Sequence, residues 1–350
     1  MDYKFYKRKW FKIAGVIVVL FLVVGGYFAI KTGYILSKIS QSKSPFLASL
    51  FHLMPGAGNA NLKSQQEGRI NVLLIGMRGQ NVPGGGLLAD SIIILSLNTK
   101  DNKVALISIP RDLYVKVPET SDRGKINSVY AYWEGGGRNQ GISKMEEMVG
   151  EITGLKINYA IVINHAGFQQ LIDTVGGIDI TLKKPFSETK QFVEGNECGG
   201  VFMLPAGTNH LNGLKALCYA RARVNTSDFD RSKRQQVMLK ALKDKLLSLG
   251  TLADFGKVNN ILNAVGNNVK TDLAPDEMKS LYEKYSGMKD AQIVQRVFEN
   301  SDKGLLTVPN IAGAGYILVP IAGEDNYSQL QDACQNIFNS DPQKDTNPAN

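Results

Sequence analysis

The chain has 350 residues, of which 43% are hydrophobic, and it carries a formal net charge of +8. This length and composition exclude a disordered or fibrous chain, and they allow one large core or two smaller ones. The positive charge favours an anionic partner such as a nucleic acid, a membrane surface or a phosphorylated substrate. Nucleic acid is the least favoured of the three, because the basic residues lack an interleaved aromatic stripe that would stack on bases.

Residues 13–30 form an uncharged apolar run, and Lys and Arg are concentrated in the segment before it. The run is long enough to cross a bilayer, and its basic flank is expected to stay in the cytoplasm. We therefore predict a cytoplasmic tail at residues 1–12, a single transmembrane helix at 13–30 and an extracytoplasmic stalk at 31–69. A cleavable signal peptide is the alternative, although no clear cleavage site follows the run. In both cases the body of the protein is exported to the outside of the membrane.

The chain has three cysteines and three histidines. Cys198 and Cys218 flank a short glycine-rich segment, so they are compatible with a disulfide in an oxidising compartment, which would leave Cys334 single. The sequence shows no Cys/His spacing typical of a structural metal site. None of the histidines has the partners that a Ser-His-Asp site requires.

Short β-branched segments bounded by Gly, Pro, Asn or Lys predict the strands of a central mixed sheet, and helical patterns lie between and after them. This order indicates a layered α/β/α domain, which we place at residues 70–340, with a disordered tail at 341–350. The expected strands cover residues 70–75, 91–97, 104–109, 159–163 and 178–182, with possible strands at 293–298 and 316–319. The expected helices cover residues 142–152, 168–175, 231–249, 252–265, 275–285 and 327–338.

The segment at residues 91–109 predicts a β-hairpin, because two apolar strands are joined by a short polar loop. If Leu97 faces Val104, then Asp90 faces Arg111, and a carboxylate and a guanidinium group meet at one sheet edge. Such a carboxylate could hold Mg²⁺ together with phosphate oxygens and water. The alternative is a purely structural Asp–Arg pair.

Basic residues are concentrated in the segment that follows the apolar run at residues 216–220. If that run is a strand, the guanidinium groups of Arg221 and Arg223 leave the same face, because the two residues are two positions apart. Two adjacent guanidinium groups form a good receptor for phosphate oxygens, which they can bind bidentately.

A helix is predicted to begin directly after this pair, with Ser227 or Asp228 as its N-cap. Arg231, Arg234 and Gln235 then lie on one face of the first turns, where the helix dipole also favours an anion. A group of arginines at a helix start suits a diphosphate better than a single carboxylate. The alternative is a solvated, salt-bridged helix surface.

Several motifs occur in a characteristic order, and this sequence shows them as NVLLIG, ADSI, SIPRD, KIN, LIDTVGGIDI, LNGLKAL, YARAR and DFDRSKRQQ. By these motifs the chain resembles the LytR-CpsA-Psr family over about residues 70–250, and more weakly beyond them. The resemblance implies a membrane-anchored phosphotransferase outside the bacterial membrane. Such an enzyme moves a glycopolymer, for example a teichoic acid or a capsular polysaccharide, from a polyprenyl diphosphate carrier to peptidoglycan through a phosphodiester.

The resemblance also implies roles for individual residues, and it places Asp90 at a magnesium-binding position. Arg78 stands near a position where the family often has a second acid, so Mg²⁺ would be held by Asp90 with water and substrate, or Arg78 would replace part of its charge. Lys125 and Asn127 add a cation and an amide for substrate binding. The residues implied as phosphate ligands are Arg111, Arg221, Arg223, Arg231, Arg234 and Gln235.

In the expected mechanism, the arginines and Mg²⁺ stabilise negative charge on the diphosphate, so catalysis is mostly electrostatic. A peptidoglycan hydroxyl attacks phosphorus, and Asp228 or Asp112 accepts its proton; the sequence does not choose between the two. Two other functions stay open at this point. One is a phosphohydrolase that uses water as acceptor, and the other is a non-catalytic anchor for anionic wall polymers.

Overall fold

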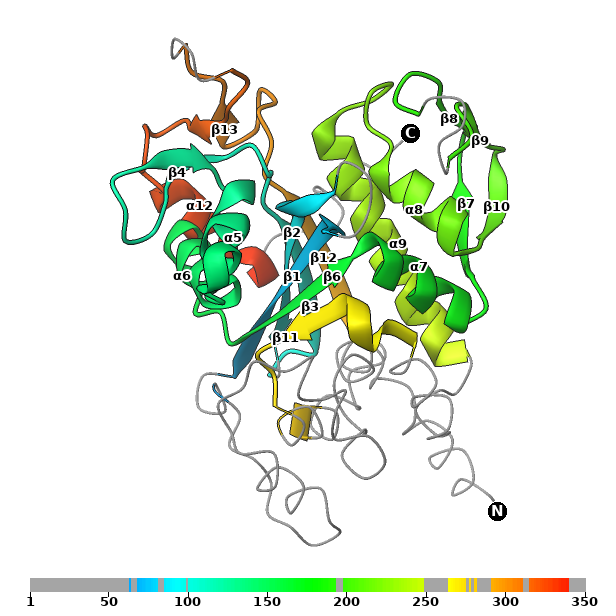
Figure 1. Ribbon diagram of the computed structural model, residues 1–350, viewed down its shortest axis with the longest axis horizontal. Coiled ribbons are helices and arrows are strands. Elements are labelled where there is room, and N and C mark those ends of the chain that lie inside the picture. The colour runs from blue at the N-terminus through cyan, green and yellow to red at the C-terminus, as the bar shows by residue number, and fades with distance from the viewer. Residues whose placement is uncertain are drawn as a thin grey trace, which may run out of the picture. The chain divides into compact units, whose positions relative to one another are not determined.

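The protein is described by a computed structural model (Figure 1). It describes residues 63, 68–80, 85–98, 100–192, 198–248, 264–274, 277, 280–281, 291–310 and 315–339. These residues fall into two compact units, which we describe separately. The sheet unit is built on residues 67–165 and 293–348, and the helical unit is built on residues 166–292.

Several predicted segments lie outside the described residues. They include the cytoplasmic tail, the transmembrane helix, most of the stalk, most of the two expected helices at 252–265 and 275–285, and the C-terminal tail at 341–350. In the part of the chain that the structure describes, no helix is both long and apolar enough to span a membrane.

The sheet unit contains a central mixed sheet, as the sequence predicted, although the strand expected at residues 178–182 does not belong to it and pairs with β10 (Gly207–Leu211) instead. Its strands are β1 (Arg69–Gly79), β2 (Gly86–Asn98), β3 (Lys103–Ser108), β6 (Tyr159–Asn164) and β12 (Gln292–Val297). They follow the order β6-β1-β2-β3-β12, with β1 antiparallel to β2, parallel to β6, and β2 antiparallel to β3. β2 and β3 bury consecutive side chains, which explains why they form continuous apolar runs in the sequence.

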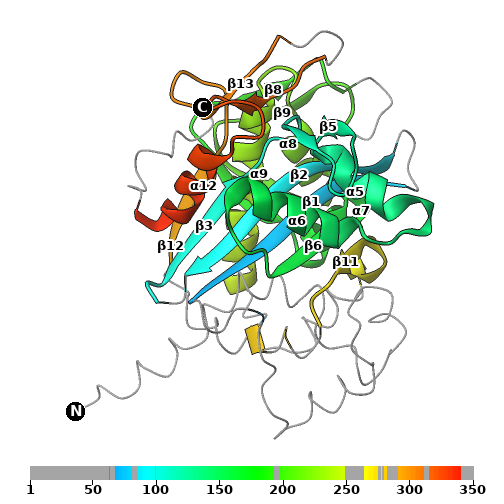
Figure 2. The same ribbon diagram turned by 90° about the vertical axis from the view of Figure 1, so that its left-hand side faces the viewer.

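Helices of the sheet unit cover one face of this sheet (Figures 1 and 2). They are α5 (Asn127–Glu134), α6 (Gly141–Thr153) and α12 (Ser328–Gln335). α5 packs on β2, and α6 packs on β6 and α12. α6 buries Ile142, Met145, Val149 and Ile152 at helical spacing. It ends at Gly154, whose φ of 64° lies in the left-handed region that favours glycine.

Short elements complete the sheet unit. They are β4 (Tyr114–Lys116), β5 (Arg123–Lys125), η1 (Gly135–Gly137), β13 (Leu306–Thr307), β14 (Val319–Pro320) and η3 (Ile337–Asn339). β4 pairs with β5 and β13 pairs with β14, both antiparallel. The expected strand at residues 293–298 is confirmed as β12, and the expected helix at 327–338 is confirmed as α12 followed by η3.

The helical unit combines helices with two small antiparallel sheets. Its elements are α7 (His165–Thr174), β7 (Ile178–Leu182), β8 (Phe186–Glu188), β9 (Phe202–Leu204), β10 (Gly207–Leu211), α8 (Gly213–Arg221), α9 (Asp228–Ser248), η2 (Gly266–Asn268) and β11 (Val269–Thr271). β7 pairs with β10, and β8 pairs with β9. α9 packs on β7 and on α8.

The condition that residues 216–220 form a strand is not met, because this segment belongs to α8. Asn212 caps the helix, since its side-chain oxygen accepts a hydrogen bond from the Lys215 backbone N–H at 3.0 Å. Arg221 is the last helical residue, and Ala222 already has an extended backbone. Arg221 and Arg223 therefore do not share a strand face but stand on either side of the helix end.

The disulfide that the sequence allowed is present. Cys198 and Cys218 are joined, with a Cα–Cα distance of 5.8 Å, and Cys334 is free and buried. The bond ties the segment between β8 and β9 to α8, which carries Arg221 at its end.

Candidate functional site

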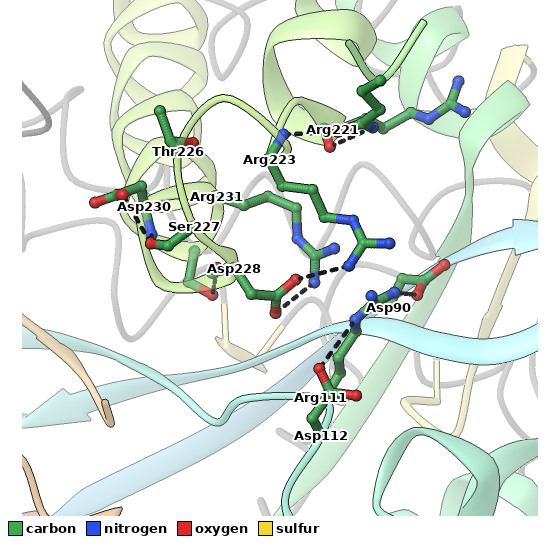
Figure 3. Close-up of polar contacts among 12 residues, drawn as sticks. Asp90, Arg111, Asp112, Arg221, Arg223, Thr226, Ser227, Asp228, Asp230 and Arg231 are labelled. Atoms are coloured by element: carbon green, nitrogen blue, oxygen red, sulfur yellow. Dashed lines mark hydrogen bonds and ion pairs between the residues drawn. The ribbon is translucent and has the colours of Figure 1, made fainter. Parts of the chain in front are cut away.

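The hairpin of β2 and β3 brings Asp90 and Arg111 together, as predicted. Leu97 pairs with Val104, and Arg111 Nη1 lies 2.5 Å from Asp90 Oδ1 (Figure 3). The side chain of Asp90 is 34% exposed. Solvent therefore reaches this ion pair and screens it, and a ligand of either charge can compete for it.

A β-bulge sets the direction of Asp90. Gly76 and Met77 are consecutive in β1, but their partners in β2 are Ser91 and Ala89, so Asp90 is the extra residue between them. A bulge interrupts the alternation of side chains along a strand and re-aims one of them, often beside a functional site. The bulge explains how Asp90 reaches the sheet edge without disturbing the buried strand that follows it.

Asp112 is buried next to two cations. Lys125 Nζ lies 2.6 Å from Asp112 Oδ1, and Arg111 Nε lies 3.7 Å from Asp112 Oδ2. Asp112 thus links the two cationic side chains. Asn127 is buried, and its backbone N–H donates to the Arg111 carbonyl oxygen at 3.3 Å. The structure therefore assigns Asn127 a contact with the backbone that carries Arg111.

The start of α9 is capped by Ser227, one of the two predicted caps. The Asp230 backbone N–H donates to Ser227 Oγ at 3.0 Å, and Ser227 Oγ donates to Asp230 Oδ2 at 2.7 Å. The Ser227 hydroxyl thus satisfies one backbone N–H of the first turn, and the Asp230 carboxylate holds that hydroxyl in place. Because Ser227 and Asp230 cap the helix, the carboxylate of Asp228 is turned to the arginines instead (Figure 3).

Asp228 holds two guanidinium groups beside each other. Arg231 Nη2 lies 3.0 Å from Asp228 Oδ2, and Arg223 Nη1 lies 3.6 Å from Asp228 Oδ1 (Figure 3). The side chain of Arg223 is 41% exposed, whereas that of Arg231 is only 6% exposed. Two positive charges and one negative charge leave a net positive cluster with Arg223 as its exposed part. Such a cluster suits an anion with several oxygens.

Arg234, one of the predicted phosphate ligands, is buried and turned to the protein backbone. The residue is 1% exposed, and its guanidinium group donates to the carbonyl oxygens of Tyr219 and Ala222 and to Thr226 Oγ1. It also lies 5.0 Å from the centre of the Phe186 ring. Burial lowers the pKa of Arg234. Arg234 therefore holds the backbone that leads from α8 to α9.

Gln235 is also turned to the protein backbone. Its Nε2 donates to the Ala220 carbonyl oxygen at 3.3 Å, near the end of α8. Arg221 lies beside an aromatic side chain, with its guanidinium carbon 5.8 Å from the centre of the Phe192 ring. Arg78 is half-buried in β1. The predicted ligands therefore have different surroundings. Arg234 and Gln235 contact backbone carbonyl oxygens, Arg221 lies beside an aromatic ring, and Arg78 is half-buried in a strand.

Two residues that were not predicted from the sequence contact the backbone between α8 and α9. Gln191 bonds to the backbone of Arg221 and Arg223, and Glu188, which is 1% exposed, accepts the backbone N–H of Asn225. Their partners lie 30 to 37 residues away in the chain. A contact across such a distance leaves no local pattern in the sequence.

The residues present fit a magnesium ion held by one carboxylate. Among the described residues, no group of three or more His, Cys, Asp or Glu could hold a metal by itself. Mg²⁺ often binds proteins through one or two carboxylates, with phosphate oxygens and water completing the octahedron. Asp90, partly exposed at a sheet edge, supplies a donor of this kind.

Comparison with known proteins gives consistent matches over most of the chain. Residues 39–322 match the model of the LytR_cpsA_psr family. A relative from Bacillus cereus, named polyisoprenyl-teichoic acid–peptidoglycan teichoic acid transferase TagU, is 30% identical over 282 residues, which cover 80% of this chain and 84% of the relative. A relative of the same name from Enterococcus faecalis is 29% identical over 272 residues, covering 77% and 80%. The crystal structure of B. subtilis TagV matches with a TM-score of 0.57 at 26% identity, covering 79% of this chain and 100% of that one.

Proposed function

Because the chain belongs to the LytR_cpsA_psr family, we propose that it transfers a glycopolymer from a polyprenyl diphosphate carrier to peptidoglycan through a phosphodiester bond. Relatives are named for the same reaction with teichoic acid as the polymer. The observation that carries the proposal is the pairing of Arg223 and Arg231 on Asp228, which presents an exposed guanidinium group backed by a second one. Teichoic acid is accordingly the polymer that we propose for this chain, rather than a capsular polysaccharide.

In the sheet unit, Arg111 is proposed to bind phosphate oxygens of the donor, with Lys125 adding a second positive charge. Both are oriented by Asp112, which contacts each of them. Asp90 would hold Mg²⁺ beside Arg111. A bound Mg²⁺ supplies positive charge to phosphate oxygens and favours departure of the phosphate leaving group.

In the helical unit, Arg223 is proposed to bind phosphate oxygens directly, because its guanidinium group is the exposed one. Arg231 supports it through their shared partner Asp228. Arg221, at the end of α8, is proposed as a further phosphate ligand. Preorganised guanidinium groups of this kind stabilise the charge that develops as phosphorus is attacked, without rearrangement at that moment.

The acceptor hydroxyl of peptidoglycan must lose its proton during attack, and Asp112 and Asp228 are the two candidate bases. Each lies beside a proposed phosphate ligand, Asp112 next to Lys125 and Asp228 next to Arg231, so each is placed close to where the donor phosphate would bind. Replacing each of the two by Asn in turn shows which one is the base. The variant that loses the base should have a lower kcat, whereas the variant that only loses positioning of an arginine should mainly have a higher KM for the donor.

We also propose that the protein is anchored by residues 13–30 and works outside the membrane. The support is the apolar run with its basic flank in the sequence. The α/β/α layering stays a prediction as well, and α5, α6 and α12 supply one helical layer within the sheet unit.

The test is transfer of a labelled teichoic acid precursor from a synthetic polyprenyl diphosphate to peptidoglycan oligomers by the full-length protein in detergent. We expect covalent product that depends on Mg²⁺ and disappears on chelation. Arg223→Ala and Asp90→Asn should each lower kcat/KM by at least about a hundredfold, since electrostatic groups of this kind contribute about 3 kcal/mol to transition-state stabilisation.

Lys240→Ala is the matched control, because Lys240 is exposed on α9, the same helix that carries Arg231. Release of free glycan phosphate without attachment to peptidoglycan would instead identify a phosphohydrolase. Donor binding that depends on the arginines, but without any turnover, would identify a non-catalytic anchor.

A further inference from the structure

Gln191 brackets the backbone between two of the arginines. Its Nε2 donates to the Arg221 carbonyl oxygen at 2.8 Å, and its Oε1 accepts the Arg223 backbone N–H at 2.7 Å. Both bonds have good length for an amide that contacts a backbone. One side chain therefore fixes the peptide units on both sides of Ala222, at the point where α8 ends.

Glu188 fixes the same loop at a second point. Its Oε2 accepts the Asn225 backbone N–H at 3.1 Å, and its Oε1 accepts the backbone N–H groups of Lys190 and Gln191, each at 3.1 Å. Burial alone would raise the pKa of Glu188, but these backbone donors outweigh it and hold the pKa below its ordinary value. Glu188 is therefore an ionised anchor that orients Gln191 and the loop together.

The loop at residues 221–227, which we call the arginine loop, is held from its other side by Arg234. That residue donates to the Ala222 carbonyl oxygen and to Thr226 Oγ1. The Cys198–Cys218 disulfide further ties α8 to the segment that follows Gln191. The backbone of the arginine loop is thus fixed by three buried or half-buried side chains, and the helix that leads into it is held by one covalent bond.

We propose that Gln191 and Glu188 are positioning residues for the phosphotransfer reaction, setting the directions in which Arg221 and Arg223 leave the backbone. This inference rests on the proposed function, because it takes Arg221 and Arg223 as donor ligands. An arginine side chain is long, and a small rotation of its peptide unit moves the guanidinium group by more than the tolerance of a bidentate phosphate contact. Neither Gln191 nor Glu188 touches the donor in this scheme.

The first test separates positioning from folding. In the full-length protein, Gln191→Ala removes both bracket bonds, and we expect the KM for the polyprenyl diphosphate donor to rise about tenfold while kcat changes less than threefold. The midpoint of thermal unfolding should stay close to that of Lys190→Ala, the control at the neighbouring exposed position. A loss of kcat in step with a lowered unfolding midpoint would overturn the proposal, because a merely structural residue behaves in that way.

The second test uses Gln191→Glu as a chemical switch. A protonated carboxyl group can donate to the Arg221 carbonyl oxygen and accept the Arg223 N–H, as the amide does, whereas an ionised carboxylate cannot donate. The side chain of Gln191 contacts backbone atoms of Arg221 and Arg223, and its own backbone N–H donates to the Glu188 carboxylate, so the residues that carry charge next to this position are Glu188, Arg221 and Arg223. At pH 8 we expect Gln191→Glu to bind the donor about tenfold more weakly than wild type does at the same pH. As the pH falls towards about 4, the affinity of the variant should approach that of wild type.

Farnesyl diphosphate, bound without any acceptor and followed by calorimetry, is the probe for this pH series. Suppose that wild type binds farnesyl diphosphate but makes no covalent product in the separate transfer assay with labelled donor and peptidoglycan. The proposed transferase function then fails, while recovery of probe binding by Q191E at low pH still supports the positioning role. If Q191E stays weak at every pH, or matches wild type at every pH, the positioning role is overturned whatever the outcome of the transfer assay.

Discussion

Single arginines in this protein differ in what their surroundings allow them to do. The side chain of Arg223 is 41% exposed and Arg231 is 6% exposed, while Arg234 is 1% exposed. An exposed guanidinium group can exchange its water for phosphate oxygens, whereas a buried one must find acceptors within the protein. Arg234 finds them in backbone carbonyl oxygens. The sequence alone does not distinguish these three arginines. Their exposure suits Arg223 to binding a ligand, Arg231 to supporting it, and Arg234 to holding the backbone.

Replacement of Arg234 tests this division. Arg234→Met keeps much of the apolar stem but leaves the carbonyl oxygens of Tyr219 and Ala222 without this donor, so the free energy of unfolding should fall by about 2–4 kcal/mol. Urea denaturation measures the change, and Lys240→Met on the exposed side of α9 should stay within about 0.5 kcal/mol of wild type. A variant that unfolds like wild type but no longer binds farnesyl diphosphate would instead make Arg234 a direct ligand.

At the level of elements, the start of α9 does two things with neighbouring side chains. Ser227 and Asp230 satisfy the helix end, and Asp228 is thereby left to pair with Arg223 and Arg231. If Asp228 were the cap, its carboxylate would accept backbone N–H groups of the helix and would not be available to the two arginines. The cap at Ser227 therefore allows Asp228 to hold Arg223 and Arg231 beside each other.

Ser227→Ala should lower the free energy of unfolding by about 1 kcal/mol, because the Asp230 backbone N–H loses its acceptor. Ser227→Asn supplies a side-chain oxygen at the same position, and most of the lost stability should return. Both are measured by chemical denaturation in parallel with transfer activity. An Ala variant as stable as wild type would show that the cap contributes nothing, and that α9 begins independently of Ser227.

Elements defined by local patterns were predictable from the sequence. The register of β2 with β3 followed from the polar loop between two apolar strands, and it placed Asp90 beside Arg111 correctly. Residue type and spacing reduced the cap of α9 to Ser227 or Asp228, and the structure shows that it is Ser227. In these cases the decisive interactions lie close together in the chain.

The remaining features had weaker signals or none. The run at residues 216–220 is too short for its period to separate strand from helix. Asn212, a good N-cap residue four positions before the run, was an available sign of a helix. The bulge at Asp90 and the contacts of Glu188 and Gln191 depend on tertiary packing, so no local pattern records them.

At the scale of the whole molecule, the family match runs through both units, from residue 39 to residue 322. Each unit has its own pairing of arginine and carboxylate, Arg111 with Asp90 in the one and Arg223 and Arg231 with Asp228 in the other. The excess of positive charge over the whole chain, +8, agrees with substrates that carry phosphate. A lipid-linked donor also requires that the protein be kept at a membrane.

Residues 13–30 are proposed to provide that anchor, and their composition allows a direct test. Val19→Arg with Leu22→Arg puts two charges into the middle of the run, each costing about 2.5–3.5 kcal/mol for insertion, so the protein should leave the membrane fraction after alkaline extraction. Ser37→Arg with Ser40→Arg adds the same charge outside the run, and this control should stay in the membrane fraction. Transfer from donor embedded in vesicles should fall with the first pair and persist with the second. If the first pair also stays membrane-bound and active, another part of the chain must hold the protein at the bilayer, and the anchor assigned to residues 13–30 is wrong.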